Sequence, residues 1–209
     1  MRLLFATGNA GKLRELARLV EGLDVRVVSP AELPAPLPEV VEDGATFAEN
    51  ARKKAVAQAR ATGLHALADD SGLCVDALGG RPGVFSARWS EAGAPGLSGL
   101  ERDLANNRLL LASLDGEPPA RRGAGYVAAL ALADPGGRVL AEVEGRCRGR
   151  IGAAPRGEGG FGYDPLFLPE AHPGRTMAEL GPAEKDAISH RGEAFRLLRP
   201  ILARLASGG

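Results

Sequence analysis

The sequence predicts an α/β fold with a mixed β-sheet flanked by helices. Two patterns support this prediction. In the first 70 residues, short apolar runs typical of buried strands alternate with segments whose apolar residues recur at helical spacing. Later, the runs 126–133 and 139–147 are joined through Asp134-Pro135-Gly136-Gly137, which is typical of an antiparallel hairpin. A chain of 209 residues without repeats or linkers indicates a single domain over 1–209.

The composition excludes several classes of partner. Lysine and arginine together number 26, as do aspartate and glutamate, so no basic field is available to hold nucleic acid. The longest clean apolar run, Val127 to Ala133, is far too short to cross a bilayer. Two cysteines are too few for a disulfide framework, and the chain starts without a signal-peptide pattern. We therefore expect a cytoplasmic protein with no nucleic-acid or membrane partner.

The first strand, over 2–6, ends in a loop of small residues that opens a helix over about 11–21. Unpaired N–H groups at a helix start bind phosphate, and a lysine adds a mobile positive charge. The segment therefore indicates a phosphate site formed by Thr7, Gly8, Asn9, Ala10, Gly11 and Lys12. The alternative is an ordinary turn with a solvated lysine, because the longer glycine-rich P-loop spacing is missing.

A strand at 24–28 precedes a proline-rich loop over 30–44. A structureless loop of this length is uncommon in a compact domain and indicates a function. Thr46 and Glu49 then form a capping box for a helix that runs to about Ala61, and Gly63 ends it.

The next strand, His65 to Ala68, runs into Asp69-Asp70-Ser71-Gly72. Adjacent carboxylates at a strand end suit an oxygen-preferring cation such as Mg²⁺. Because successive strand residues point to opposite faces, one of Asp69 and Asp70 can face the site while the other holds the loop. The alternative is an Asx-type turn, which explains one aspartate better than two.

Two further segments carry candidate binding residues. After a helix over 99–113 and the hairpin, the segment 157–165 places four glycines around two rings, which predicts a stacking platform for a base. The alternative is a hairpin connection whose rings lie in the core. A short helical turn at 177–180 follows. Lys185, His190 and Arg191 are expected at the start of a long C-terminal helix. The alternative is that they are solvated helix charges, and a lone histidine is more often structural than catalytic.

Taken together, six segments in order closely resemble the inosine triphosphate pyrophosphatase family, bacterial branch. They are Thr7-Gly8-Asn9-x-x-Lys12, Thr46-Phe47-x-Glu49-Asn50-Ala51, Asp69-Asp70-Ser71-Gly72-Leu73, Pro82-Gly83-x-x-Ser86-Ala87-Arg88, Gly159-Gly160-Phe161-Gly162-Tyr163-Asp164-Pro165 and Ala187-Ile188-Ser189-His190-Arg191-Gly192. The resemblance covers residues 2 to about 204. It implies hydrolysis of dITP, ITP and XTP to the monophosphate and pyrophosphate. It also implies an elongated mixed sheet in two lobes with the active-site cleft between them, and a homodimer.

The resemblance further implies a role for each matching residue. Glu42 and Asp70 match the metal positions for Mg²⁺, with Mn²⁺ as a substitute, and Asp70 also matches the proton acceptor. Because one carboxylate serves poorly as both ligand and base, Asp69 and Asp70 can share these roles. The other matching positions are Thr7 to Lys12 with Ser71 and Lys185 for the phosphates, Phe161, Gly162, Tyr163 and Asp164 around the base, and His190 and Arg191 at the base edge. Because hypoxanthine and xanthine offer an acceptor at O6, our hypothesis is that Arg191, or His190 with it, is directed at O6.

Three alternatives remain. A sister family of nucleotide pyrophosphatases acts on pyrimidine or modified nucleotides, but the Ser-His-Arg and Phe-Gly-Tyr-Asp segments argue against it. An aspartate-nucleophile phosphatase needs an Asp-x-Asp spacing that Asp69-Asp70-Ser71 does not have. A nucleotide sensor without turnover would tolerate loss of Asp70 or Glu42, and both positions are acidic here.

Overall fold

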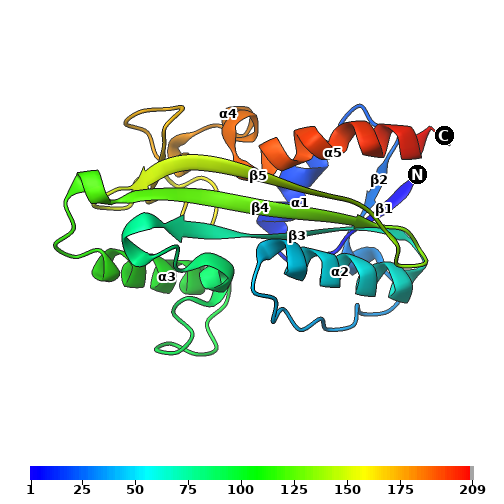
Figure 1. Cartoon of the computed structure of the whole chain (residues 1–209), viewed down its shortest axis with the longest axis horizontal. Helices are drawn as coiled ribbons and strands as arrows, with labels where there is room; N and C mark the ends of the chain where they lie inside the picture. The colour runs from blue at the N-terminus through cyan, green and yellow to red at the C-terminus, as the bar shows by residue number, and fades with distance from the viewer. Residues whose placement is uncertain (208–209) are drawn as a thin grey trace. The chain divides into compact units, whose positions relative to one another are not determined.

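The structure, a computed structural model, describes residues 1–207. Its helices and strands, all but β6 labelled in Figure 1, follow the order strand, helix, strand, helix at first and end with two helices. They are β1 (Arg2–Phe5), α1 (Ala10–Leu19), β2 (Arg26–Val28), α2 (Phe47–Thr62), β3 (His65–Val75), α3 (Gly99–Ser113), β4 (Gly123–Ala133), β5 (Val139–Ile151), β6 (Phe167–Pro169), α4 (Pro182–Ile188) and α5 (His190–Ala206).

The six strands form one sheet in the order β2-β1-β3-β4-β5-β6. Strand β1 pairs in parallel with β2 and β3, through Leu3↔Val27 and Leu3↔His65. Strands β5 and β6 pair antiparallel, with Arg150 opposite Leu168. The long strands β3, β4 and β5 run side by side in Figure 1. A sheet with both kinds of pairing and flanking helices confirms the predicted mixed α/β fold.

The chain divides into two compact units with separate hydrophobic cores. The first comprises Met1–Asp70, Ala128–Gly145 and the chain from His190 onward, and its core includes Leu3, Leu67 and Phe195. The second comprises Ser71–Val127 and Arg146–Ser189, and its core includes Leu73, Leu110, Tyr126 and Phe167. The chain passes from one unit to the other inside β3, β4 and β5, and again directly before α5. The single domain over 1–209 stays a prediction.

The predicted helix signals are confirmed. The Thr46 side chain accepts from Glu49 N, and the Glu49 carboxylate accepts from Thr46 N, which closes the capping box of α2. Gly63 ends α2 in the left-handed conformation, with φ of 66°. Helix α3 has the predicted bounds, and α5 continues through Pro200.

Two local predictions were wrong. Strand β3 does not end at Ala68 but runs to Val75, so Asp69 and Asp70 lie in the middle of a strand. A buried strand tolerates two aspartates there because both carboxylates have ionic or amide partners. Lys185 lies on α4 and not on the last helix. Helix α4 begins at Pro182, and the extended backbone of Ser189 separates it from α5.

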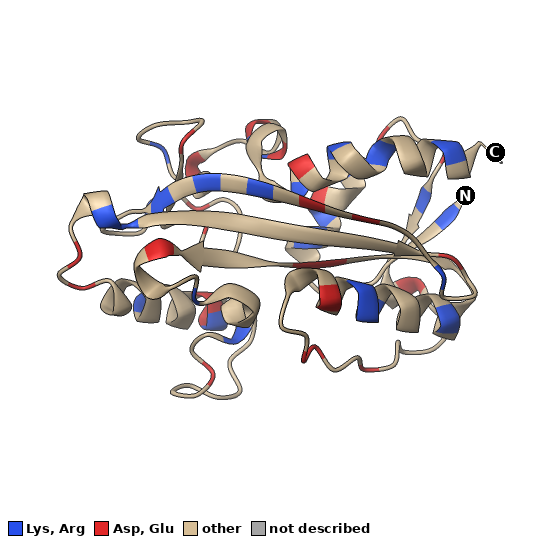
Figure 2. Ribbon diagram, in the orientation of Figure 1, with Lys and Arg blue, Asp and Glu red and all other residues tan. Residues whose placement is uncertain are grey.

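The surface carries charge of both signs. Figure 2 shows lysine and arginine interspersed with aspartate and glutamate on strands and helices alike. Within residues 1–207, every helix is too short or too polar to cross a membrane.

Candidate functional site

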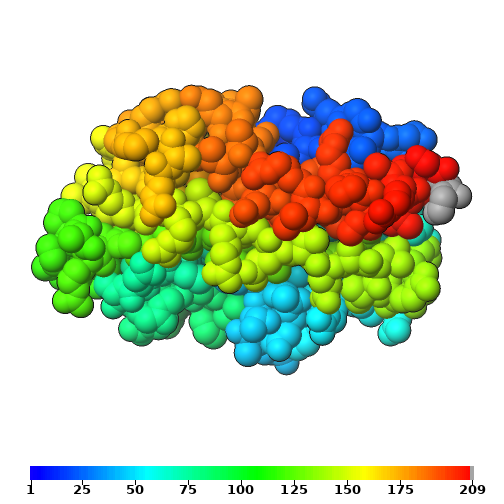
Figure 3. Space-filling model, turned by 45° about the horizontal axis from the view of Figure 1, so that its top comes forward, coloured from blue at the N-terminus to red at the C-terminus, as the bar shows by residue number. Residues whose placement is uncertain are grey.

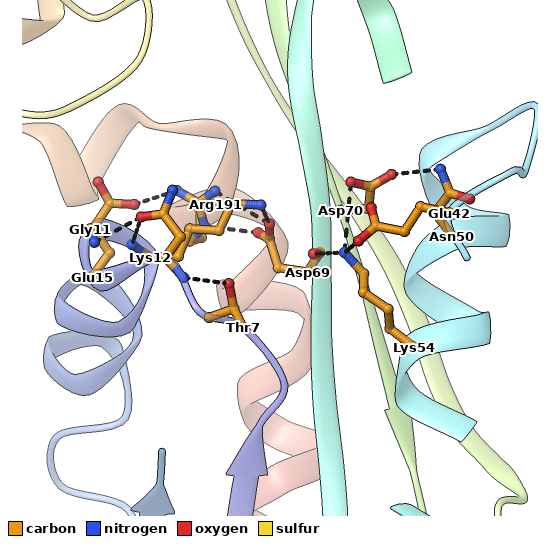
Figure 4. A network of polar contacts seen from close by, with 11 residues as sticks. Thr7, Gly11, Lys12, Glu15, Glu42, Asn50, Lys54, Asp69, Asp70 and Arg191 are labelled. Atoms are coloured by element: carbon orange, nitrogen blue, oxygen red, sulfur yellow. Dashed lines mark hydrogen bonds and ion pairs between the residues drawn. The ribbon is translucent and has the colours of Figure 1, made fainter. Parts of the chain in front are cut away.

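Asp69 and Asp70 point to opposite sides of β3, as Figure 4 shows. Asp69 faces α1 and the start of α5, whereas Asp70 faces α2. The alternation follows from strand geometry and gives each carboxyl group its own surroundings. All the side chains labelled in Figure 4 belong to the first unit.

The Asp69 side holds a buried ion network. Arg191 donates from Nε to Asp69 Oδ2 at 2.8 Å and from Nη1 to Glu15, and Lys12 Nζ also donates to Asp69. Burial alone would raise the pKa of Asp69, but Arg191 and Lys12 outweigh it and hold that pKa well below its usual value. Asp69 is therefore a fixed negative charge that aligns two cations, and it is a poor proton acceptor.

The loop before α1 is already capped from within. Asn9 Oδ1 accepts from Gly11 N at 2.8 Å and from Lys12 N at 3.2 Å, and Thr7 Oγ1 accepts from Asn9 N at 3.1 Å. These N–H groups are among those that the sequence indicates for phosphate. Burial lowers the pKa of Lys12, although Asp69 opposes this shift. The predicted arrangement of strand, loop and helix is confirmed. Two of the N–H donors of the loop, those of Gly11 and Lys12, already donate to Asn9.

Arg191 reaches this network because α5 lies close against β5. Figure 3 shows the side chains of α5, in red, beside the yellow-green residues of the hairpin. A Cβ on Gly145 of β5 would overlap His190 O and Ala194 N. Only glycine permits this approach without a shift of the helix, and Arg191 is 1% exposed as a result of the packing.

The Asp70 side brings together an amide, a lysine and a second carboxylate. Asn50 Nδ2 donates to Asp70 Oδ2 at 3.0 Å, and Asn50 Oδ1 accepts from Gly44 N at 2.8 Å. Lys54 Nζ lies 3.2 Å from Glu42 Oε1, 3.8 Å from Asp70 Oδ1 and 2.9 Å from Asp69 O. Burial raises the pKa of Asp70, and Lys54 only partly offsets this shift.

The carboxylates of Glu42 and Asp70 therefore both face one positive charge, the ammonium of Lys54. Two carboxylates around a single positive charge fit Mg²⁺, which proteins hold through one or two carboxylates with substrate phosphates completing the shell. Among residues 1–207, no group of three His, Cys, Asp or Glu side chains forms a metal cage. The donor set suits a metal that arrives with its nucleotide.

In the second unit, the glycine-rich segment separates its two rings. Tyr163 is part of the core and donates from its hydroxyl to Ser86 O at 2.8 Å, which matches the alternative of a core ring. Phe161 is half-buried, and Lys185 Nζ lies 4.8 Å from its ring centroid. Asp164 Oδ2 accepts from Phe161 N at 2.9 Å and from Lys185 Nζ at 2.5 Å. Phe161 is thus the more exposed of the two rings.

The predicted residues fall into two groups. Thr7 to Lys12, Glu42, Asp70, His190 and Arg191 belong to the first unit. The second unit contains Ser71, Phe161, Gly162, Tyr163, Asp164 and Lys185. Arg191 makes its ion pairs with Asp69 and Glu15, beside the loop predicted for phosphate.

Sequence reasoning missed Glu15, Asn50 and Lys54 as site residues. Glu15 follows Lys12 by three positions, which places both on one face of α1. Asn50 and Lys54 are four apart on α2, next to the buried positions Ala51 and Ala55. Their position as polar residues at the edge of an apolar helix face is the sequence signal that could have identified these three residues.

The chain is similar to known proteins over almost its whole length. A dITP/XTP pyrophosphatase of Anaeromyxobacter dehalogenans is 59% identical to this chain over an alignment of 234 residues, gaps included, which covers both chains completely. A HAM1 protein structure from Coxiella burnetii has a TM-score of 0.83 at 37% identity, covering 98% of this chain and 99% of that one. A dITP/XTP pyrophosphatase structure from Mycobacterium abscessus has a TM-score of 0.71 at 48% identity, covering 97% and 100%. The model of the Ham1 family matches residues 3–201, and the chain belongs to this family.

Proposed function

We propose that this chain hydrolyses the non-canonical purine nucleoside triphosphates dITP, ITP and XTP to the nucleoside monophosphate and pyrophosphate. The names of its full-length relatives support this substrate class. The observation that carries the reaction is Asp70, a buried carboxyl group of raised pKa beside Glu42 and Lys54. A base of this kind beside a cation-binding carboxylate suits attack of water on a phosphoanhydride.

Asp70 is the proton acceptor in this proposal. Asn50 donates to one carboxylate oxygen and so fixes the plane of the group, which leaves the other oxygen directed at Lys54. The raised pKa makes Asp70 a stronger base than an exposed aspartate. Asp69, which two cations hold ionised, serves as their anchor instead.

Glu42 would hold Mg²⁺, or Mn²⁺ in its place, and Asp70, the second matching metal position, would face the same metal mainly as the acceptor of the proton from the water. When bound, the metal would neutralise phosphate charge and polarise the water that attacks phosphorus. Lys54 pairs with both carboxylates and keeps them together, and the metal would displace its ammonium from that point. Lys12 at the loop, with Ser71 and Lys185, completes the proposed phosphate contacts.

Phe161 provides the stacking surface for the base, bounded by Gly162, Tyr163 and Asp164. Reading of the base edge by His190 and Arg191 stays a prediction. The ion pairs of Arg191 with Asp69 and Glu15 support a different role, in which Arg191 aligns Asp69 with Lys12. The homodimer, the cytoplasmic location and the cleft between lobes also stay predictions.

One assay tests the proposal. Purified protein is incubated with ITP, dITP, XTP, ATP, GTP, dUTP and CTP, with and without Mg²⁺, and the products are separated by anion exchange. We expect monophosphate and pyrophosphate in equal amounts from the first three substrates, and only with the metal. Orthophosphate as the first product would contradict the proposal, preference for dUTP or CTP would favour the sister family, and binding without turnover would favour the sensor.

A further inference from the structure

Helix α3 holds both ends of one residue in the glycine-rich segment. Asp103 Oδ2 accepts from Gly162 N at 2.8 Å, and Asn107 Nδ2 donates to Gly162 O at 3.0 Å. Asp103 and Asn107 are four positions apart, so they project from the same face of α3. All three residues belong to the second unit.

Gly162 lies between the two rings of the segment. It has a φ of +62°, which a residue with a side chain rarely adopts. On its far side, Tyr163 is anchored in the core through Ser86. Fixing the N–H and C=O of Gly162 therefore fixes the direction in which the chain presents Phe161.

Asn107 lowers the stability of the folded protein at this buried position. The residue is 7% exposed, and its Oδ1 has no hydrogen-bond partner among residues 1–207. A buried acceptor without a partner destabilises the folded protein, whereas an apolar side chain of similar shape removes that penalty. The need for a core residue does not explain asparagine here, but the donation to Gly162 does.

We propose that Asp103 and Asn107 are positioning residues that hold Phe161 to Asp164 in the shape that receives the nucleobase. Neither residue needs to touch the substrate, because each acts through the backbone of Gly162. Preorganisation of a binding segment lowers the ordering cost of binding. The two hydrogen bonds from Asp103 and Asn107 to Gly162, which we call the clamp, therefore affect recognition of the base. They leave the phosphate contacts of the first unit unaffected. This inference rests on the proposed function.

The test uses Asp103→Ala and Asn107→Leu, each of which removes one contact. Asp103→Asn is the rescue variant, because its amide oxygen still accepts from Gly162 N. Arg108→Ala, an exposed substitution on α3, is the matched control. For each protein, KM and kcat are measured with ITP, together with the inhibition constant of inorganic tripolyphosphate at saturating Mg²⁺ and the melting temperature.

The loss of one hydrogen bond should raise KM for ITP about three- to tenfold in Asp103→Ala and Asn107→Leu, with kcat within about twofold. Tripolyphosphate, which has no base, should lose far less affinity than ITP in these variants, because the phosphate contacts of the first unit do not depend on Gly162. Asp103→Asn should restore KM, and Asn107→Leu should melt at or above the wild-type temperature. An unchanged KM would overturn the inference, as would a parallel rise of both constants with a lower melting temperature.

The clamp and the proposed function fail in different ways. If wild-type protein does not hydrolyse ITP, the proposed function is wrong. The clamp is then tested by calorimetric titration of ITP into wild type, Asp103→Ala and Asp103→Asn. Weaker binding to Asp103→Ala alone would support the clamp, and equal binding to all three would exclude it.

Discussion

Asp69 and Asp70 are adjacent on β3, but their carboxyl groups have pKa shifts of opposite sign. Arg191 and Lys12 overcome the effect of burial and lower the pKa of Asp69, whereas burial prevails at Asp70 and raises its pKa. One residue is therefore a permanent counter-ion, and the other is the stronger base of the two. Strand alternation alone separates these environments.

The substitution Asp70→Asn should nearly abolish turnover, by at least about 10²-fold, because it removes the proton acceptor. It should also leave the protein as stable or more stable, since a buried ionised carboxylate is costly. Pyrophosphate release from ITP and thermal melting measure the two effects. Asp43→Asn, in the same loop as Glu42 but exposed, is the control. Substantial activity in Asp70→Asn would exclude Asp70 as the base.

The substitution Asp69→Asn should have the opposite effect on stability. It leaves the buried guanidinium of Arg191 and the ammonium of Lys12 without their shared carboxylate. Breaking a buried ion pair from one side costs about 3–5 kcal/mol. Urea unfolding at pH 7 measures this loss beside Asp70→Asn, and equal stability of the two variants would contradict the environments assigned here.

The substitution Lys54→Met should strengthen binding of Mn²⁺ to the nucleotide-free protein. Lys54 is the cation between Glu42 and Asp70, so its removal leaves two carboxylates without a counter-charge. Turnover should fall, because Glu42 and Asp70 lose the cation that holds them together. Calorimetric titration with Mn²⁺ measures the affinity. Lys53→Met is the control, since Lys53 pairs with exposed Asp43; the same gain in both variants would contradict the prediction.

The substitution Gly145→Ala should destabilise the protein by about 1–3 kcal/mol, which is typical of overpacking. The added Cβ overlaps backbone atoms of His190 and Ala194, so the start of α5 must shift. Because Arg191 belongs to this turn, kcat for ITP should fall as well. Gly93→Ala, where a Cβ meets only ordinary contact, is the control. Normal stability and activity in Gly145→Ala would show that α5 moves freely.

Glu184 should contribute to stability in a pH-dependent way. A hydrogen bond from Arg175, helped by Gly181 N, lowers the pKa of Glu184 to about 2. A lowered pKa in the folded state stabilises the protein fully above the unfolded value of roughly 4.3. That contribution is lost as the pH falls towards 2. The melting temperature of wild type should exceed that of Glu184→Gln at pH 7, and the gap should narrow below pH 4.

A gap that stays constant between pH 7 and pH 3 would show that packing and not charge explains the effect of Glu184→Gln. Glu91→Gln, an exposed substitution in the same unit, serves as the control and should match wild type at every pH.

Local signals in the sequence predicted most of the fold. Periodicity and caps identified α2 and α3, since Thr46, Glu49 and Gly63 act within a few residues of their own position. The continuation of β3 through Asp69 and Asp70 was not predictable in this way. It depends on Arg191 and Lys12, which are distant in the sequence and neutralise Asp69 only after folding.

The candidate site shows the same limit. Motif residues were identified one by one, but the partner of each was not. Glu15, Asn50 and Lys54 have ordinary helix positions in the sequence, and only the tertiary structure brings them to Arg191, Asp70 and Glu42. A buried polar side chain reveals its role through its partner, which single-sequence patterns do not contain.

If the loop before α1 binds phosphate as proposed, the Asn9 cap makes that binding an exchange of hydrogen-bond acceptors. Asn9 Oδ1 already satisfies the donors of Gly11 and Lys12, so α1 begins in an ordered state without nucleotide. A phosphate oxygen that takes these donors displaces an internal acceptor, and its net gain is the difference between two hydrogen bonds. When the product departs, the amide returns and refills the gap. A proposed phosphate loop of this kind would therefore hold pyrophosphate less tightly than a loop with open donors, and the product would leave more readily after each turnover.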